Sequence, residues 1–143
     1  MNTNLGFCLA LHRAHASLQL KLDNELGTYH GISFNDFVLL NLLAQADGGR
    51  VSIPELMRPL GLPQSSVLRQ LILLEKIGLL VRESANGDRQ AVLRPAGRAL
   101  VYAARETADS ICTEAVVSIA PAVLATVSAA LATLARTTRH AQD

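Results

Sequence analysis

The stretch from Ser52 to Arg94 reads SIPELMRPLGLPQSSVLRQLILLEKIGLLVRESANGDRQAVLR. It predicts a helix, a tight turn, a second helix and a two-stranded hairpin, in that order. Ser52 followed by Pro54 and Glu55 is typical of a helix start, because a hydroxyl caps free N–H groups and proline is tolerated in the first turn. Gly61 suits the left-handed residue that ends a helix. This order is that of a helix-turn-helix with a wing.

The second helix is expected from about Gln64 to Ile77, and it has the chemistry of a DNA major-groove reader. Its apolar residues, expected to face the core, recur at three- and four-residue spacing: Val67, Leu68, Leu71, Leu74 and Ile77. Arginine pairs with guanine, glutamine pairs with adenine, and hydroxyls bond phosphate or base edges. The residues expected to contact DNA are Gln64, Ser65, Ser66, Arg69, Gln70 and Lys76. The helix alone leaves open an ordinary amphipathic helix with a solvated polar face.

The hairpin that follows is expected to form a wing. Asn86-Gly87 is a strong turn signal, because both central residues of such a turn need positive φ. Arg89 near the tip is suited to a minor groove or to phosphate, and Asp88 beside it could hold the guanidinium in place. The expected contacts therefore also include Ser52, Asp88, Arg89 and Gln90. The alternative for Asp88 and Arg89 is a simple solvated loop tip.

Composition and charge favour a single helical domain with a basic centre. The chain has 143 residues, is half apolar and has no tryptophan. Residues 50–98 carry a net charge of +4, whereas the remainder carries −3. A basic centre on a neutral-to-acidic frame is the expected electrostatic pattern of a DNA-contacting module. We expect a soluble, cytoplasmic protein without a membrane span.

No pattern in the sequence indicates catalysis or a cofactor. Cys8 and Cys112 lie far apart and outside any Cys-x-x-Cys pair, so neither a metal site nor a disulfide framework is expected. No nucleophile–base pair, paired carboxylates, phosphate-cradling glycine loop or metal cluster is recognisable. We therefore expect neither an enzyme nor a bound cofactor.

The flanking segments are expected to be helical and to join two copies of the chain. Helices are predicted over about 4–27, 34–46, 95–118 and 121–136, with a linker at 28–32. Ser33 and Asp36 predict a capping box, and Val51 a very short strand beside the wing. The last helix is apolar on nearly every side, so we expect its surplus face to be covered by the same helix of a second subunit and by the first helix. A homodimer that presents two reading helices predicts a pseudo-palindromic site with half-sites about one helical turn apart.

The chain resembles the MarR family of winged helix-turn-helix transcriptional regulators. The matching pieces lie in order along the chain: Ile53-Pro54-Glu55-Leu56, Gln64-Ser65-Ser66-Val67-Leu68-Arg69, Leu74-Glu75-Lys76-Ile77-Gly78-Leu79-Leu80, Asp88-Arg89 and Pro95-Ala96-Gly97-Arg98-Ala99-Leu100. The resemblance implies a mainly α fold with a small β wing, one domain over 1–143, a DNA-binding lobe at 33–94 and dimerisation helices at 4–27 and 96–137. It also implies a homodimeric regulator, more often a repressor.

Three features depart from the pattern of the family. Leu73 and Ile77 stand where many members carry basic residues, and the wing is shorter than usual. The wing pattern Asp-x-Arg becomes Asp88-Arg89-Gln90, so the tip arginine is either shifted by one position to Arg89 or replaced by Gln90. These departures leave open a protein-interaction module that has lost DNA binding.

The resemblance implies that a small aromatic or phenolic acid releases the DNA. Members bind such ligands between the dimer helices and the DNA-binding lobe. The residues that could line this pocket here are His12, Arg13, His15, Tyr29, Phe34 and Phe37. The same residues could equally belong to the core and the dimer interface.

A second alternative is a redox-sensing regulator of the same fold that uses Cys8. Hydroperoxide-sensing members place a reactive cysteine near this position and hold its thiolate with two tyrosines. Gly6 is the residue that aligns with that cysteine, and Phe34 and Phe37 stand in place of the tyrosines. A phenyl ring cannot donate the required hydrogen bond, so a buried, inert thiol is the competing interpretation of Cys8.

Overall fold

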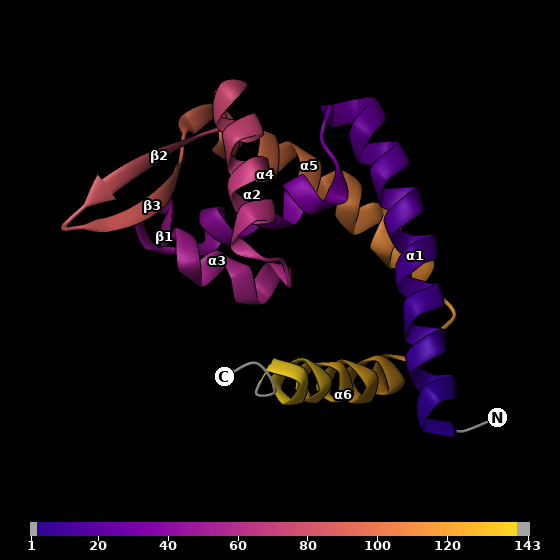
Figure 1. Cartoon of the computed structure of the whole chain (residues 1–143). Helices are drawn as coiled ribbons and strands as arrows, with labels where there is room; N and C mark the ends of the chain where they lie inside the picture. Colours follow the sequence, from indigo (N-terminus) through magenta and orange to yellow (C-terminus); the bar gives the residue numbers. More distant parts are fainter. Residues whose placement is uncertain (1–2, 140–143) are drawn as a thin grey trace. The chain divides into compact units, whose positions relative to one another are not determined.

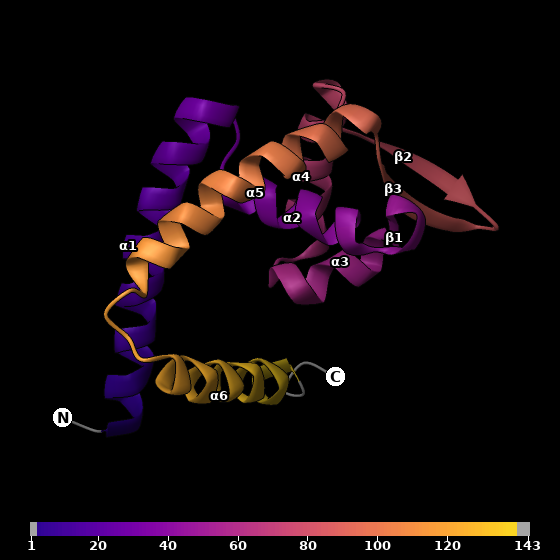
Figure 2. The ribbon, with the colours of Figure 1, turned by 180° about the vertical axis from the view of Figure 1, so that it is seen from behind.

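The computed structural model describes residues 3–139 and confirms a mainly α fold with a small three-stranded sheet (Figures 1 and 2). The chain divides into two compact units, Met1–Ile111 and Cys112–Asp143. The elements are α1 (Thr3–His30), α2 (Phe34–Gln45), a 3₁₀ turn (Asp47–Gly49), β1 (Arg50–Ser52), α3 (Ile53–Leu60), α4 (Gln64–Lys76), β2 (Leu80–Ala85), β3 (Asp88–Leu93), α5 (Pro95–Ala115) and α6 (Pro121–Arg139). Among the helices of the described segment, none is long and apolar enough to span a bilayer.

The sheet is antiparallel in the order β1-β3-β2, with β3 in the centre. Val51 lies opposite Ala91, which confirms the predicted short strand beside the wing. The β2–β3 hairpin closes at Asn86 and Gly87, whose φ values of 55° and 78° are both positive. A two-residue turn of this kind matches the right-handed twist of the strands, and the predicted hairpin is therefore confirmed.

The core of the first unit lies among α2, α3, α4 and the inner face of the sheet. Its fully buried side chains are Leu39, Leu40, Leu43, Leu56, Val67, Leu71 and Leu80, with Leu22 and Leu26 of α1. Because the apolar residues of α4 recur every three to four positions, one face of that helix packs inward. The prediction that Ile77 belongs to this core is wrong. Ile77 follows the last residue of α4 and is 62% exposed.

The junction between α1 and α2 is shorter than predicted. Residues 28–30 were expected to form a linker, but they belong to α1, which ends at His30. Gly31 follows with a φ of 70°. His30 Nε2 lies 2.8 Å from Thr107 Oγ1 of α5, so the end of α1 is tied to α5. The predicted capping box of Ser33 and Asp36 is present at the start of α2.

Two helices expose apolar side chains in the single chain. In α1, Leu5, Leu9 and Leu20 are solvent-exposed, whereas Leu22 and Leu26 are buried. In α6 no residue from 121 to 138 is buried. These helices therefore carry apolar surface available to another chain.

Candidate nucleic-acid interface

The solvent face of α4 presents most of the polar side chains predicted to read DNA. Gln64, Ser65, Arg69 and Lys76 are exposed, and Ser66 is half-buried. The turn before α4 depends on Gly61, whose φ of 64° places it in the left-handed region and whose N–H donates to the carbonyls at the end of α3. The turn sets the angle between α3 and α4. It thereby leaves the polar face of α4 open to a partner.

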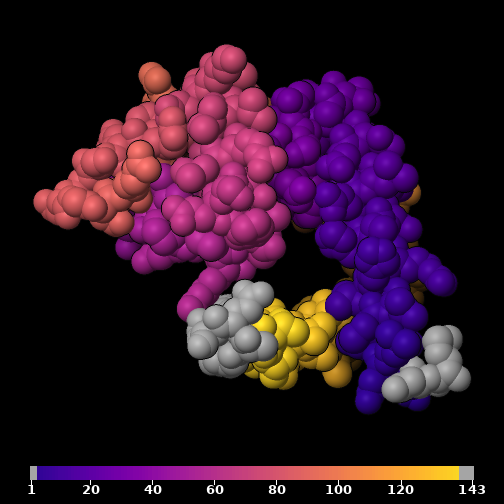
Figure 3. All heavy atoms as spheres, in the orientation of Figure 1, coloured from indigo at the N-terminus to yellow at the C-terminus, as the bar shows by residue number. Residues whose placement is uncertain are grey.

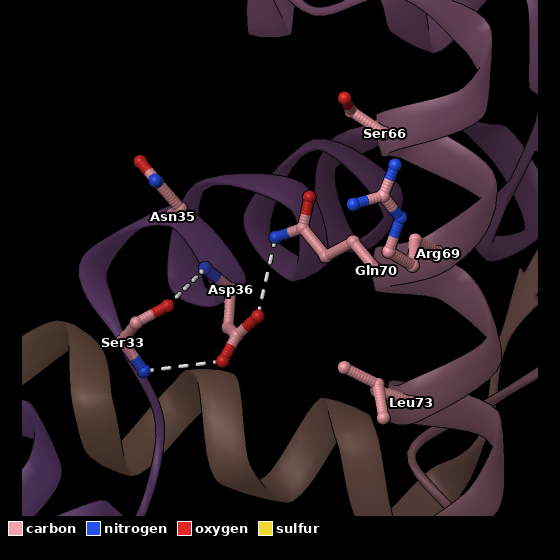
Figure 4. A pocket seen from close by; sticks show the side chains of 7 residues that line it. All are labelled: Ser33, Asn35, Asp36, Ser66, Arg69, Gln70 and Leu73. Carbon is pink, nitrogen blue, oxygen red and sulfur yellow. Dashed lines mark hydrogen bonds between the residues drawn. The ribbon is translucent and has the colours of Figure 1, made fainter.

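A groove lies between the start of α2 and this face of α4 (Figure 4). Its volume is about 290 Å³, and it is lined by Ser33, Asn35, Asp36, Ser66, Arg69, Gln70 and Leu73. Gln70 is half-buried here, and its Nε2 donates to Asp36 Oδ1 at 3.2 Å. Leu73 is 62% exposed in the middle of the polar face, so its departure from the usual basic residue leaves an apolar spot there.

The outer face of the wing is held by side chains that were predicted to contact DNA. Ser52 Oγ donates to Asp88 Oδ1 at 3.1 Å, and Ser52 makes no side-chain cap on α3. Two expectations are therefore wrong. The Ser52 side chain does not cap the helix, and Asp88 accepts a hydrogen bond from Ser52 instead of holding the guanidinium of Arg89. Gln90 Oε1 accepts a hydrogen bond of 2.9 Å from Arg50, which also lies 3.7 Å from Glu83.

Arg89 lies on the inner face of the wing, next to the start of α4. Strand alternation places it on the same face as buried Ala91, whereas Gln90 points to the opposite face. A second cavity, of about 200 Å³, is lined by Ile53, Pro54, Gln64, Leu68, Gly87, Asp88 and Arg89. The structure therefore brings Arg89 and Gln64 to one site, and Gln90 does not take the place of the tip arginine. Figure 3 shows the wing, in orange, extending from the part of the chain that contains α3 and α4.

The base of the wing is anchored to the end of α4 by an ion pair that the sequence reasoning missed. Glu75 Oε1 accepts from both the backbone N and the Nε of Arg82, each at 3.0 Å. The hydrogen bond from the Arg82 side chain holds the pKa of the Glu75 carboxyl below its usual range. In the sequence, only the positions of Glu75 and Arg82 on either side of the Gly78 turn could have indicated this ion pair. The contact fixes the direction in which the wing leaves α4.

Glu75→Gln is expected to reduce the acid sensitivity of folding. The pKa of Glu75 is lower in the folded protein than in the unfolded chain. Its contribution to the free energy of unfolding is therefore fully present above the unfolded pKa of about 4.3, and it is lost as the pH falls through the folded-state pKa. The wild-type free energy of unfolding should therefore fall more steeply below about pH 4.3 than that of the variant. Urea titrations between pH 6 and 3 measure this, with Glu106→Gln as a charge-matched control. Parallel pH curves for wild type and Glu75→Gln would contradict it.

The residues predicted to form an effector pocket do not come together within one chain. Tyr29 is 69% exposed, and Phe34 stacks on Phe37 with ring centroids 6.3 Å apart. Phe37 is only 8% exposed, so it belongs to the core. His12, Arg13 and His15 are exposed on the same helix as Tyr29. At 1.5 Å per residue, His15 lies roughly 21 Å from Tyr29 along α1.

Cys8 is solvent-exposed in the single chain, so the expectation of a buried thiol is wrong. It lies near the start of α1, whereas Phe34 and Phe37 follow the end of that helix. The length of α1 separates Cys8 from His30 by roughly 33 Å along the axis. Within one chain, therefore, neither phenylalanine lies where it could support a thiolate.

The exposed polar face of α4, the glycine turn between α3 and α4, and the two-stranded wing paired with β1 together define the winged helix-turn-helix class. A family model described as "MarR family" matches residues 30–91, which span α2, α3, α4 and most of the wing. Over this segment, which forms the core of the winged helix-turn-helix, the chain is therefore similar to the MarR family. No curated protein matches the sequence.

Solved structures of MarR family regulators share this fold along nearly the whole chain. AbsC from Streptomyces coelicolor is 20% identical with a TM-score of 0.87, covering 98% of this chain and 97% of AbsC. Sco3205 from the same organism, solved in complex with DNA, is 19% identical with a TM-score of 0.86, covering 96% and 88%. CouR from Rhodococcus jostii RHA1, bound to p-coumaroyl-CoA, is 21% identical with a TM-score of 0.81, covering 92% and 91%.

Proposed function

We propose that this protein is a sequence-specific, double-stranded-DNA-binding transcriptional repressor that acts as a homodimer on a pseudo-palindromic operator. The observation that carries the proposal is the common placement of Gln64 at the start of α4 and Arg89 on the inner face of the wing. Arg69 extends the same exposed face of α4. A winged helix binds DNA through a helix that contacts base edges in the major groove and through a wing residue that contacts the phosphate backbone or the minor groove. Here α4 and Arg89 would make these two contacts.

The distribution of free positive charge supports this interface. Arg50 and Arg82 face Glu83 and Glu75, so they contribute little net charge to a phosphate backbone. Neither Arg69 nor Arg89 has an ion-pair partner among residues 3–139. Arg69 and Arg89 are therefore available to phosphate, and each phosphate that they neutralise would add about one unit to the logarithmic dependence of affinity on salt.

Homodimer formation is supported by the exposed apolar surface of α1 and α6. Leu5, Leu9 and Leu20 are exposed in α1, and Val123 and Val127 in α6. Large exposed apolar patches mark interaction sites, and isologous pairing covers the same patch on both copies. The dimer would carry two α4 helices to half-sites about one helical turn apart.

Release by a small aromatic or phenolic acid is a further part of the proposal. CouR, which shares the fold, was solved with p-coumaroyl-CoA bound. Here Arg13, His12 and His15 could hold a carboxylate, and Tyr29 and Phe34 could hold a ring. Because about 21 Å of helix separates the two groups in one chain, the pocket would combine one group from each subunit. Displacement of bound DNA by a panel of aromatic acids would test this.

The proposal is tested by fluorescence anisotropy with DNA from upstream of the protein's own gene and a scrambled control of equal length. Titrations at two salt concentrations separate specific from electrostatic binding. Tight binding that prefers the upstream sequence and weakens with salt would support the regulator. Equal affinity for both DNAs at both salt concentrations would overturn it in favour of an interaction module.

Arg69→Ala is expected to weaken specific binding by about 1–3 kcal/mol, because a bidentate contact to a guanine would be lost. Competition between operator and scrambled DNA measures the change in specificity. Arg89→Ala serves as the comparison and should lower affinity for both DNAs without changing the preferred sequence. If Arg69→Ala leaves the specificity ratio unchanged, Arg69 does not read a base.

A further inference from the structure

The side-chain amide of Gln70 is held in one orientation by the neighbouring helix. One terminal atom of the Gln70 side chain lies 3.2 Å from Asp36 Oδ1. An ionised carboxylate can accept hydrogen bonds but cannot donate them. The atom facing Asp36 is therefore the amino group, and the usual ambiguity between the two ends of a glutamine amide is removed. Figure 4 shows the opposite end, the oxygen Oε1, pointing away from Asp36.

Asp36 is itself fixed before any partner binds. Its Oδ2 accepts from the backbone N–H of Ser33 at 3.1 Å, and its own N–H donates to Ser33 Oγ at 3.0 Å. The N–H of Phe34 donates to Asp23 Oδ1 of α1 at 2.7 Å, which holds the same turn from the other side. With one carboxylate oxygen used for capping, the other is directed at Gln70. The orientation of the Gln70 amide is therefore set by the start of α2.

We propose that Asp36 is a positioning residue that presents Gln70 to DNA as a hydrogen-bond acceptor. In the major groove only adenine and cytosine offer an amino group, whereas guanine and thymine present only acceptors. The protein would thus favour adenine or cytosine where Gln70 reaches, and disfavour guanine and thymine. Ser66, Arg69 and Leu73 line the same groove, so Gln70 belongs to the proposed reading face. This inference rests on the proposed function.

Asp36→Asn is expected to reverse the preference at one position of each half-site. The new asparagine must keep an oxygen toward the Ser33 N–H, so its amino group turns to Gln70. That amino group can only donate, and the Gln70 amide must flip to accept from it with Oε1. The Gln70 amino group would then face DNA, and guanine or thymine would be favoured. The free energy of one hydrogen bond corresponds to a change of about three- to tenfold in the ratio of adenine or cytosine to guanine or thymine at that position.

The experiment is selection of random-sequence DNA by the purified full-length wild type and by each variant, followed by sequencing. Asp36→Asn combined with Gln70→Glu is the rescue control, because a carboxylate accepts from the new asparagine and again presents an acceptor to DNA. The double variant should return to adenine or cytosine at that position. A general loss of structure would not produce such a reversal and rescue.

The outcomes separate this inference from the proposed function. Wild-type protein that selects no consensus overturns the proposed function and the inference with it. A wild-type consensus that Asp36→Asn leaves unchanged overturns the inference alone. If Asp36→Asn does not fold, Gln70→Ala decides, because it should lose the preference at that one position and keep it elsewhere. An unchanged consensus for Gln70→Ala shows that Gln70 does not read a base.

Discussion

Gly97→Ala is expected to lower the free energy of unfolding by about 3 kcal/mol or more, at the upper end of the range for overpacking. A Cβ at Gly97 would lie 2.1 Å from the backbone carbonyl oxygen of Leu79 and 2.6 Å from Leu93 Cδ1. The carbonyl cannot retreat freely, because it accepts a hydrogen bond of 3.0 Å from the N–H of Arg94. The start of α5 would therefore have to move away from the base of the wing.

Urea denaturation followed by circular dichroism measures this change, and Gly27→Ala is its matched control. Gly27 lies within α1, and a Cβ there would meet nothing within 4 Å. In that open helical position alanine should stabilise the protein by up to about 1 kcal/mol. Opposite signs for the two glycines are expected. A Gly97→Ala protein as stable as wild type would show that α5 does not pack this closely on the wing.

Leu131→Asp is expected to convert the proposed dimer into monomers, raising the dissociation constant at least about a hundredfold, or roughly 3 kcal/mol. Val123, Val127 and Leu131 recur every four residues along α6 and are 50%, 43% and 37% exposed. This spacing forms an apolar stripe on one face of the helix. A carboxylate within the stripe would be buried without a partner in both copies, and an unpaired buried charge is strongly unfavourable.

Sedimentation velocity over a range of concentrations measures the change, and operator binding by anisotropy measures its consequence. Ala129→Asp places the same charge on the opposite face of α6 and serves as the control. Monomers of Leu131→Asp should keep a folded lobe but bind DNA weakly, because only one half-site is contacted. A dimer that persists in Leu131→Asp would show that this stripe is not the interface.

Local signals were sufficient for most of the helices and the wing. The capping box at Ser33 and the turn at Asn86-Gly87 were predicted correctly, because these signals depend on residues within a few positions of one another. The left-handed Gly61 was predicted for the same reason. The exposed Arg69 follows from the helical period of α4, which packs its apolar face inward. The sequence by itself therefore determined the order of the elements and the face of α4 that is open.

Only the tertiary structure decided which polar side chains are already engaged. Asp88 holds Ser52 of β1, and Gln70 is oriented by Asp36 of α2, across separations of 36 and 34 residues. Phe37 is buried and Cys8 exposed because packing between distant helices, which no local pattern encodes, determines burial. Hydrogen bonds between distant elements depend on sheet register and helix placement. For this physical reason, the sequence identified the polar surface, whereas the fold decided which of its groups remain free to bind.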